Sequence, residues 1–527
     1  MPGTAAAATP ALSWIPRRRY DRRVRLVSGA GAAAALLAAG CVTAGRPFQC
    51  PASGGPPWRD LASEHFVVRT DLTRADAVAL AGRLEQLRAA VASTLFEGAP
   101  EAPGRVEVVA FRDGAEYREF APAGVDAYYL RYVGGPPRIV LSGELGGTQR
   151  ALLAHELAHH FLAGVFPRGP RWLVEGIAVY VETLRDADDG KTVLAGTPSP
   201  ARLERVRREP VDVRDLFRWR SGTPPRSSLR EYATSWLLVH FLAQRRPAEF
   251  RDYQMRLVRN EEPEAAWRAA FPEWDPATPA LEGLDRLLAI YARSEVASRR
   301  VEVPLTSPAG MLEQPIPPPE VHAIRLGLWP QRAAHDPAEL RAEVDETLRE
   351  DPAHPLALQA RAALEGTDPL PPARASVAAH PDDPRAWTFL ALSLRDASAA
   401  AEREGAYRQA AALAPDNAAA LHNLAGELLD QGRSSKALPL ARQAALLAPW
   451  SPPLLETYAA VLSDLGRCAE AAAIQQRALD ALPDGAGAET RAASGTRLAA
   501  YAVQCGTAAP ARGVERATPL PARPVAP

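Results

Sequence analysis

Two histidines four residues apart are the part of this chain best suited to catalysis. His155 and His159 lie in the stretch His-Glu-Leu-Ala-His, inside an apolar run at 150–165 that predicts one helix. Residues four apart share one face of a helix, so both imidazoles point the same way. Two neutral imidazoles and a carboxylate form a zinc site with one position open to water. Glu156 is then placed to act as a general base rather than as a ligand. The alternative is a helix on which the histidines are ordinary polar positions.

A second apolar run, at 171–180, carries the candidate third ligand, Glu175. Helix breakers separate the two runs: Gly164, Pro167, Gly169 and Pro170. Helices joined by a short loop pack against each other, so Glu175 can face the two histidines. The alternative is an exposed acid favoured by the helix dipole. The apolar neighbours Trp172 and Leu173 fit burial better, and a buried carboxylate needs a partner.

These two stretches together resemble a known family. His-Glu-Leu-Ala-His, followed by Trp-Leu-Val-Glu-Gly-Ile-Ala-Val-Tyr at 172–180, is similar to the gluzincin zinc metallopeptidases of the bacterial peptidase MA-like group. The resemblance covers residues 63–293. It implies an α+β zincin-like catalytic domain that binds one Zn²⁺ per chain. In that family the matching residues bind zinc at His155, His159 and Glu175, and the glutamate matching Glu156 is the catalytic base.

Further residues near these motifs have two interpretations each. A zinc peptidase needs a donor for the oxyanion, and Tyr232 is the first candidate, with Tyr180 and His240 as the others. Each of the three could instead pack in the core. His160 points away from His159 and is expected at the surface or behind the ligands. Glu182 is expected to be a solvated acid; its alternative role is to orient a ligand histidine.

The elements expected around this site are strands at 65–70, 106–111 and 138–141 and a long helix at 71–94. The strand at 138–141 precedes the active-site helix directly. In gluzincins a strand at this position borders the cleft, where its free backbone would pair with an extended peptide substrate. The alternative is a plain sheet edge.

The first residues resemble an export signal. Arginines cluster between positions 17 and 25, an apolar segment follows at 26–39, and Leu-Ala-Ala-Gly precedes Cys41. The favoured interpretation of 1–41 is a signal with a bacterial lipobox, which would anchor the chain to a membrane through lipid on Cys41. The alternative is ordinary cleavage near Ala39, with Cys41 free to pair with Cys50. Residues 42–58 are expected to be a tether. Either way the predicted location is the bacterial cell envelope, outside the cytoplasm.

Composition sets broader limits. A chain of 527 residues with 47% hydrophobic residues predicts two or three domains, assigned here as a metallopeptidase domain at 59–300 and a second domain after it. The net charge of −1 gives no electrostatic reason to expect a nucleic-acid partner. Prolines gather at 301–330, which predicts a semi-rigid linker.

The C-terminal half contains a repeat. Pro381, Pro415, Pro449 and Pro483 are 34 residues apart. This period, with a proline ending each unit, is the tetratricopeptide signature and predicts an all-α solenoid at 331–506. Gly432 and Gly466 occupy the turn inside two units, whereas the unit before Pro415 lacks that glycine. Such an array predicts docking of a protein partner; the alternative is a structural extension without a ligand.

The remaining expectations concern the C-terminal end and the function. Cys468 and Cys505 could form a disulfide or remain two buried thiols, and 507–527 is expected to be disordered. The preferred hypothesis is an exported zinc-dependent peptide hydrolase whose repeats dock a partner or a peptide or protein substrate. The alternative is a non-catalytic envelope scaffold in which the repeats carry the function and the metal site is structural or vestigial.

Overall fold

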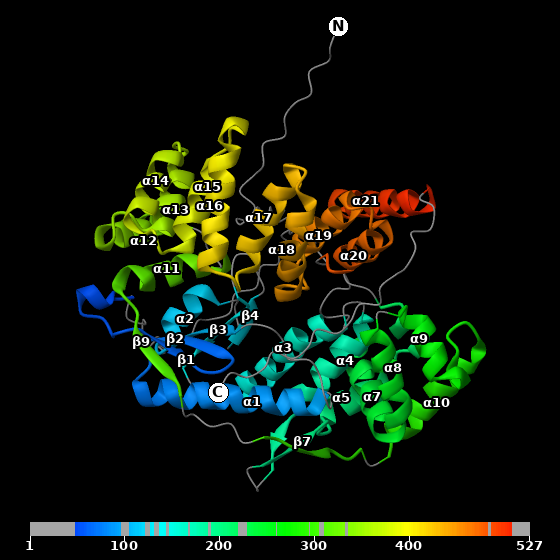
Figure 1. Ribbon diagram of the computed structural model, residues 1–527. Coiled ribbons are helices and arrows are strands. Elements are labelled where there is room, and N and C mark those ends of the chain that lie inside the picture. The colour runs from blue at the N-terminus through cyan, green and yellow to red at the C-terminus, as the bar shows by residue number, and fades with distance from the viewer. Residues whose placement is uncertain are drawn as a thin grey trace, which may run out of the picture.

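The computed structural model has a sheet-containing N-terminal part and a curved array of helices above it (Figure 1). The structure describes these residues: 48–95, 105–121, 127–130, 136–143, 147–166, 169–187, 191–219, 229–259, 261–294, 296–304, 310–332, 336–482 and 486–507. The export segment with Cys41 and the tail from 508 lie outside them, as does the side chain of Cys505. Cys468 is buried and disulfide-bonded. None of the described helices has the length and apolar character to cross a bilayer.

A six-stranded mixed sheet organises the N-terminal part. Its strand order is β4-β5-β3-β2-β1-β9. The strands are β1 (Arg59–Ala62), β2 (Phe66–Thr70), β3 (Val106–Phe111), β4 (Ala127–Leu130), β5 (Arg138–Ser142) and β9 (Leu312–Pro315). The central strands β2, β3 and β5 are parallel, while β1, β9 and β4 pair antiparallel with their neighbours. The expected strands at 65–70, 106–111 and 138–141 therefore form the middle of the sheet.

Both faces of the sheet are covered, which explains why β3 is apolar at nearly every position. Val108 of β3 belongs to a large core with α1 (Arg74–Leu95) and α3 (Gly147–Val165). Val109 belongs to a second core with α2 (Gly114–Phe120) and α11 (Pro318–Leu328). Successive side chains of a strand point to opposite faces, so a strand between two helical layers needs apolar residues on both.

The strand at 138–141 does not lie at a sheet edge, so that expectation is wrong. β5 is hydrogen-bonded on both sides, to β3 and to β4. The edge is β4, whose short segment Ala-Tyr-Tyr-Leu gave no clear strand signal in the sequence. β4 lies against α3, so it takes the place beside the histidine helix that was expected for β5.

Helices complete the N-terminal part around α3. The helix α4 (Arg171–Glu182) packs against α3 and against α7 (Leu229–Arg245). The outer cover consists of α5 (Pro200–Arg208), α6 (Val213–Phe217), α8 (Pro247–Val258), α9 (Pro263–Ala270) and α10 (Glu282–Tyr291). A small sheet in the order β6-β7-β8 lies beside them: β6 (Arg185–Asp186), β7 (Thr192–Ala195) and β8 (Arg299–Glu302).

The C-terminal array consists of antiparallel helix pairs, as the repeat period predicts. Its helices are α12 (Pro337–Glu350), α13 (Pro355–Glu365), α14 (Leu370–Ala379), α15 (Pro384–Ser393), α16 (Ala400–Leu413), α17 (Ala418–Asp430), α18 (Ser434–Leu447), α19 (Pro452–Asp464), α20 (Cys468–Asp480) and α21 (Ala488–Thr507). Gly432 and Gly466 have φ of 69° and 74° in the turns after α17 and α19. A left-handed turn of this kind favours glycine. The pair α15–α16 lacks the glycine and has a 3₁₀ turn at Ala397–Ala399 instead.

The described parts of the stretches expected as linker and tether, 48–58 and 301–304 with 310–330, belong to the fold. Within 301–330, β9 extends the sheet and α11 covers one of its faces. Most of the prolines in this stretch stand at element starts or ends, where a missing N–H costs nothing. Within the expected tether 42–58, Phe48 packs edge-on to His322 of α11, and Trp58 is 2% exposed. These segments join the sheet to the array rather than separating them.

The close approach of α4 and α7 gives a first prediction. A Cβ at Gly176 would lie 2.7 Å from both the Ser235 carbonyl oxygen and Val239 Cγ2. We expect Gly176→Ala to destabilise the N-terminal part by about 1–3 kcal/mol through overpacking. Gly82→Ala in α1 is the matched control, since nothing lies within 4 Å of its Cβ, and it should stabilise by about 0.5–1 kcal/mol. Thermal unfolding followed by circular dichroism measures both, and an unchanged midpoint for Gly176→Ala would contradict the close contact.

Candidate metal centre

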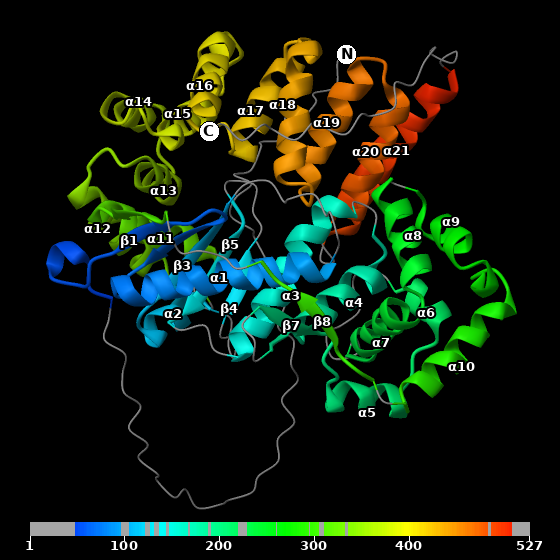
Figure 2. The same cartoon turned by 60° about the horizontal axis from the view of Figure 1, so that its bottom comes forward.

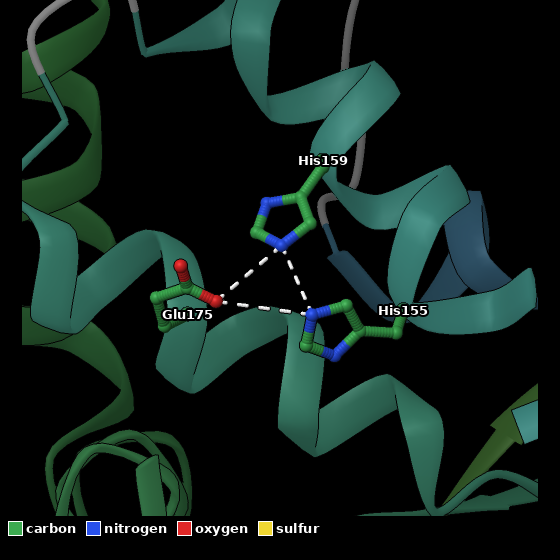
Figure 3. Close-up of side chains that lie close together, drawn as sticks. All are labelled: His155, His159 and Glu175. Carbon is green, nitrogen blue, oxygen red and sulfur yellow. Dashed lines mark hydrogen bonds and ion pairs between the residues drawn. The ribbon is translucent and has the colours of Figure 1, made fainter. Parts of the chain in front are cut away.

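The two histidines of α3 and the glutamate of α4 converge on one point (Figure 3). The Nε2 atoms of His155 and His159 are 3.0 Å apart. Glu175 Oε2 lies 3.8 Å from His155 Nε2 and 3.4 Å from His159 Nε2. Among the described residues, these three form the group of histidine, cysteine and acidic side chains whose ligand atoms are close enough to hold a metal ion.

Local sequence explains how the two helices meet. After α3, Gly169 approaches closely enough that a Cβ would lie 2.9 Å from Phe166 and Val174 side-chain atoms. Pro170 follows with extended backbone, and its carbonyl accepts from the Leu173 N–H at the first turn of α4. A short reversal at glycine and proline therefore lays α4 beside α3 and brings Glu175, four residues into α4, opposite the histidines.

The geometry fits a divalent metal with nitrogen and oxygen ligands. In a tetrahedral zinc site with bonds of about 2.0–2.1 Å, ligand atoms stand about 3.3 Å apart, and the observed 3.0, 3.4 and 3.8 Å bracket that spacing. Glu175 Oε2 is buried without a hydrogen-bond partner among the described residues. Leaving such an oxygen unpaired costs free energy, which a cation at the centre of the three ligands would remove.

Glu182, two turns after Glu175, holds His155 from behind. Its Oε2 lies 3.4 Å from His155 Nδ1, and its Oε1 accepts a 2.7 Å hydrogen bond from Arg202 of α5. The expectation of a solvated acid is therefore wrong, and the alternative role is the one that the geometry supports. A carboxylate on Nδ1 fixes the ring orientation and leaves Nε2 free to bind a metal.

The second oxygen of Glu175 faces Arg171. Glu175 Oε1 lies 3.8 Å from Arg171 Nε, and the Arg171 guanidinium stacks 4.4 Å above the centre of the Trp219 ring. Planar stacking on an indole holds a guanidinium in one orientation. The two carboxylate oxygens therefore have different surroundings: a positive charge beside Oε1 and the two imidazoles beside Oε2.

Neighbouring charges shift the pKa values of His155 and Glu175 in opposite directions. Burial alone would lower the pKa of His155, but the hydrogen bond to Glu182 and the charges of Glu156 and Glu175 outweigh it, so that pKa is raised. Burial alone would raise the pKa of Glu175, but His159, His155 and Arg171 hold it below its ordinary value. A bound cation would replace the protons that this negative cluster attracts.

Glu156, the predicted base, is not a member of the converging ligand group. It follows His155 on α3 and is partly exposed. Its charge nevertheless acts on His155. Its role as a base therefore stays a prediction.

The three candidate oxyanion donors differ in their burial and in their neighbours. His240 is fully buried: its Nδ1 lies 2.8 Å from the Tyr291 hydroxyl and its Nε2 2.9 Å from the Gly196 carbonyl. Tyr180 is 4% exposed and packs edge-on against His240. Both belong to the core. Tyr232, on α7, is partly buried with its ring 5.2 Å from the ring of Trp219, which also contacts Arg171. Tyr232 and Arg171 therefore contact the same indole, that of Trp219.

Two contacts at the site had no sequence signal. His160 is 6% exposed, and its Nδ1 lies 3.0 Å from the hydroxyl of Tyr129 on β4. Its position after His159 suggested a residue behind the ligands but could not identify a partner on a strand. The orientation of Arg171 toward Glu175 likewise depends on stacking against Trp219, which is 48 residues further along the chain.

Comparison with known proteins finds similar solved structures but no matching family. No family model matches the chain, and no curated protein matches it either. Similar solved structures include a thermophilic TPR protein from Thermus thermophilus, 19% identical, covering 35% of this chain and 95% of that chain with a TM-score of 0.26. The MamA protein is 15% identical, with coverage of 31% and 91% and a TM-score of 0.25. PilF of Pseudomonas aeruginosa is 17% identical, with coverage of 36% and 86% and a TM-score of 0.29.

These likenesses do not extend to a function for this chain, and they give the gluzincin resemblance no support. The helical-repeat architecture rests on the chain's own helix pairs and on their 34-residue period.

The contact between Glu182 and His155 gives the second prediction. We expect Glu182→Gln to weaken Zn²⁺ binding about tenfold, because the carboxylate that orients His155 and raises its basicity is lost. Asp186→Asn is the matched control: Asp186 pairs with Arg150 of the same helix α3 but contacts no ligand. Competition with a chromogenic chelator measures both affinities. Equal affinities for the two variants would show that Glu182 does not orient His155.

Proposed function

We propose that this chain is a zinc-dependent peptide hydrolase of the gluzincin type whose helical repeats dock a protein partner or substrate. The observation that carries the proposal is the convergence of His155 Nε2, His159 Nε2 and Glu175 Oε2 from two helices. A second feature favours catalysis rather than a structural metal: Glu156 follows His155 directly on α3, its charge acts on that ligand, and it does not belong to the group. A purely structural site has no use for such a base.

Each residue of the site has a separate role in the proposed reaction. His155, His159 and Glu175 would hold Zn²⁺, with Glu182 orienting His155. When bound, zinc supplies Lewis-acid activation of water and of the scissile carbonyl. Glu156 takes a proton from the attacking water and returns it to the leaving amine. Tyr232 is proposed to donate a hydrogen bond to the carbonyl oxygen as negative charge develops there.

The sheet offers a place for an extended peptide. β4 is an edge strand beside α3, and an edge strand has backbone groups that can pair with another chain. A substrate strand added to β4 would pass next to the histidine helix, which is the β-augmentation mode expected earlier for β5.

A second candidate function is a non-catalytic scaffold. The observation that favours it is the chain's own array of helix pairs with a 34-residue period, an architecture that commonly binds protein partners. Under it, the repeats bind protein partners and the metal site is structural or vestigial. Both proposals share the docking array and an address in the bacterial cell envelope, with the lipid anchor on Cys41 or ordinary cleavage near Ala39 as its two forms.

Metal content separates the two proposals. We expect purified protein to carry about one zinc per chain, and Glu175→Ala to lose it because two imidazoles alone do not complete the site. Glu209→Ala, which removes an exposed acid near the end of α5, is the control and should keep the metal. Inductively coupled plasma mass spectrometry gives the stoichiometry. Parent protein without zinc, even after incubation with the metal, would favour the scaffold.

The base is tested by a variant that keeps the metal. Glu156→Gln should bind zinc like the parent and hydrolyse a peptide library at least about 100-fold more slowly, since general-base catalysis typically contributes 10²–10⁴-fold. Mass spectrometric detection of new termini measures the cleavage. Parental rates in Glu156→Gln would remove this residue from the mechanism, and a zinc-loaded parent that cleaves nothing in the library would favour a structural metal site.

A further inference from the structure

The repeat array is fixed to the N-terminal part at its first helices. Glu320 of α11 accepts from Arg385 at the start of α15, with Oε2 2.9 Å from Nη1, and lies 3.2 Å from His354 Nε2 at the start of α13. Arg325 of the same helix pairs at 2.8 Å with Glu116 of α2 and at 3.1 Å with Glu343 of α12. These partly or fully buried ion pairs hold the first part of the array on the back of the sheet.

A second contact lies far along the array, at the turn between α18 and α19. The ring of Trp450 in this turn is 6.0 Å from the ring of His160 on α3, with the two planes tilted by 54°. Figures 1 and 2 both place this end of the α18–α19 pair next to α3. The array therefore returns to the N-terminal part and touches the helix that carries the two histidine ligands.

Trp450 belongs to the array as well as to this contact. It packs against the apolar cluster of the repeats that includes Leu421, Leu424 and Leu454. By contrast, the equivalent position one repeat earlier, Asp416, is exposed. One aromatic side chain thus bridges the packed interior of the array and a buried histidine of α3.

His160 connects this bridge to the metal centre. It follows His159 directly, and consecutive residues on a helix point about 100° apart. His160 therefore faces away from the ligand pair while sharing its turn of helix. Its Nδ1 is 3.0 Å from the Tyr129 hydroxyl on the edge strand β4. Contacts from β4 and from the array accordingly hold this turn from two sides.

We propose that the repeat array is part of the metal centre, and that Trp450 is a positioning residue that acts through His160 on the turn of α3 carrying His159. The inference rests on the proposed zinc site and deepens it. Ligand geometry within about 0.5 Å decides metal affinity and reactivity, and side chains behind the ligands maintain that geometry. Removing the indole frees one side of His160 and allows this turn of the helix to shift.

The test compares zinc affinity in the full-length chain and three variants. We expect Trp450→Ala to weaken Zn²⁺ binding about tenfold, the lower end of the effect seen for residues behind metal ligands. Trp450→Phe should restore most of the affinity, because it keeps an aromatic ring at the contact. Trp387→Ala is the matched control: Trp387 packs against the same cluster of the repeats, and its indole N–H donates to the Pro381 carbonyl. It should leave the affinity within about twofold.

A double-mutant cycle shows whether Trp450 acts through His160. If it does, Trp450→Ala should have little further effect on zinc affinity in a His160→Ala background. The visible absorption of Co²⁺-substituted protein supplies a readout of ligand geometry, which should change in Trp450→Ala and stay parental in Trp387→Ala. Circular dichroism of each variant reports whether the repeats remain folded.

The outcomes separate this inference from the proposed function. A parent that binds zinc and a folded Trp450→Ala variant with the same affinity and the same Co²⁺ spectrum would overturn the positioning role alone. Equal losses in Trp450→Ala and Trp387→Ala would also overturn it, because the effect would then follow from general weakening of the array. A parent that binds no zinc would overturn the proposed metal centre and this inference together.

Discussion

The organisation around α3 depends on the burial of one carboxylate. Glu175 is held between helices, with one oxygen beside Arg171 and the other beside two imidazoles. An ionised carboxylate is removed from water only where charges or donors compensate it. Apolar residues flank Glu175 on α4 and keep it partly buried. Arg171 and the histidines of α3 supply part of the compensation, and a cation bound by Oε2 would supply the rest. The packing of α3 against α4 therefore depends on the same residues that form the candidate metal site.

Successive layers keep that arrangement in place. Gly176, next to Glu175 in the sequence, allows the backbone of α7 to approach α4 closely. Glu182 and Arg202 extend the network from His155 to α5. On the other side of α3, His160 connects to β4 and to the array. The ligand helix is thus contacted by α4, by β4 and by the turn between α18 and α19, while α5 and α7 contact α4 in turn. Contacts behind the ligands are how a protein maintains ligand geometry.

The helix α11 has the corresponding role between the two parts of the chain. Its apolar side, with Val321, Ile324 and Leu328, completes the core on the back of the sheet. Its charged side chains, Glu320 and Arg325, pair with helices of the array and with α2. Removing one partner from a buried ion pair strongly destabilises a folded protein, because the other charge is left unpaired. The ion pairs of α11 therefore favour one relative orientation of the N-terminal part and the array. The proline content that predicted a linker reflects instead the many helix and strand ends in this stretch.

The sequence by itself determined the local features. The four-residue spacing of His155 and His159 places them on one helix face, the 34-residue period predicts helix pairs, and apolar runs locate the three central strands of the sheet. Each follows from contacts within one element or between neighbouring elements. Tertiary structure alone decided that β4 and not β5 is the edge, that Glu182 turns toward His155, and that Trp450 reaches His160. These depend on contacts between residues distant in the chain, and the type of a single residue carries no information about which distant side chain will face it.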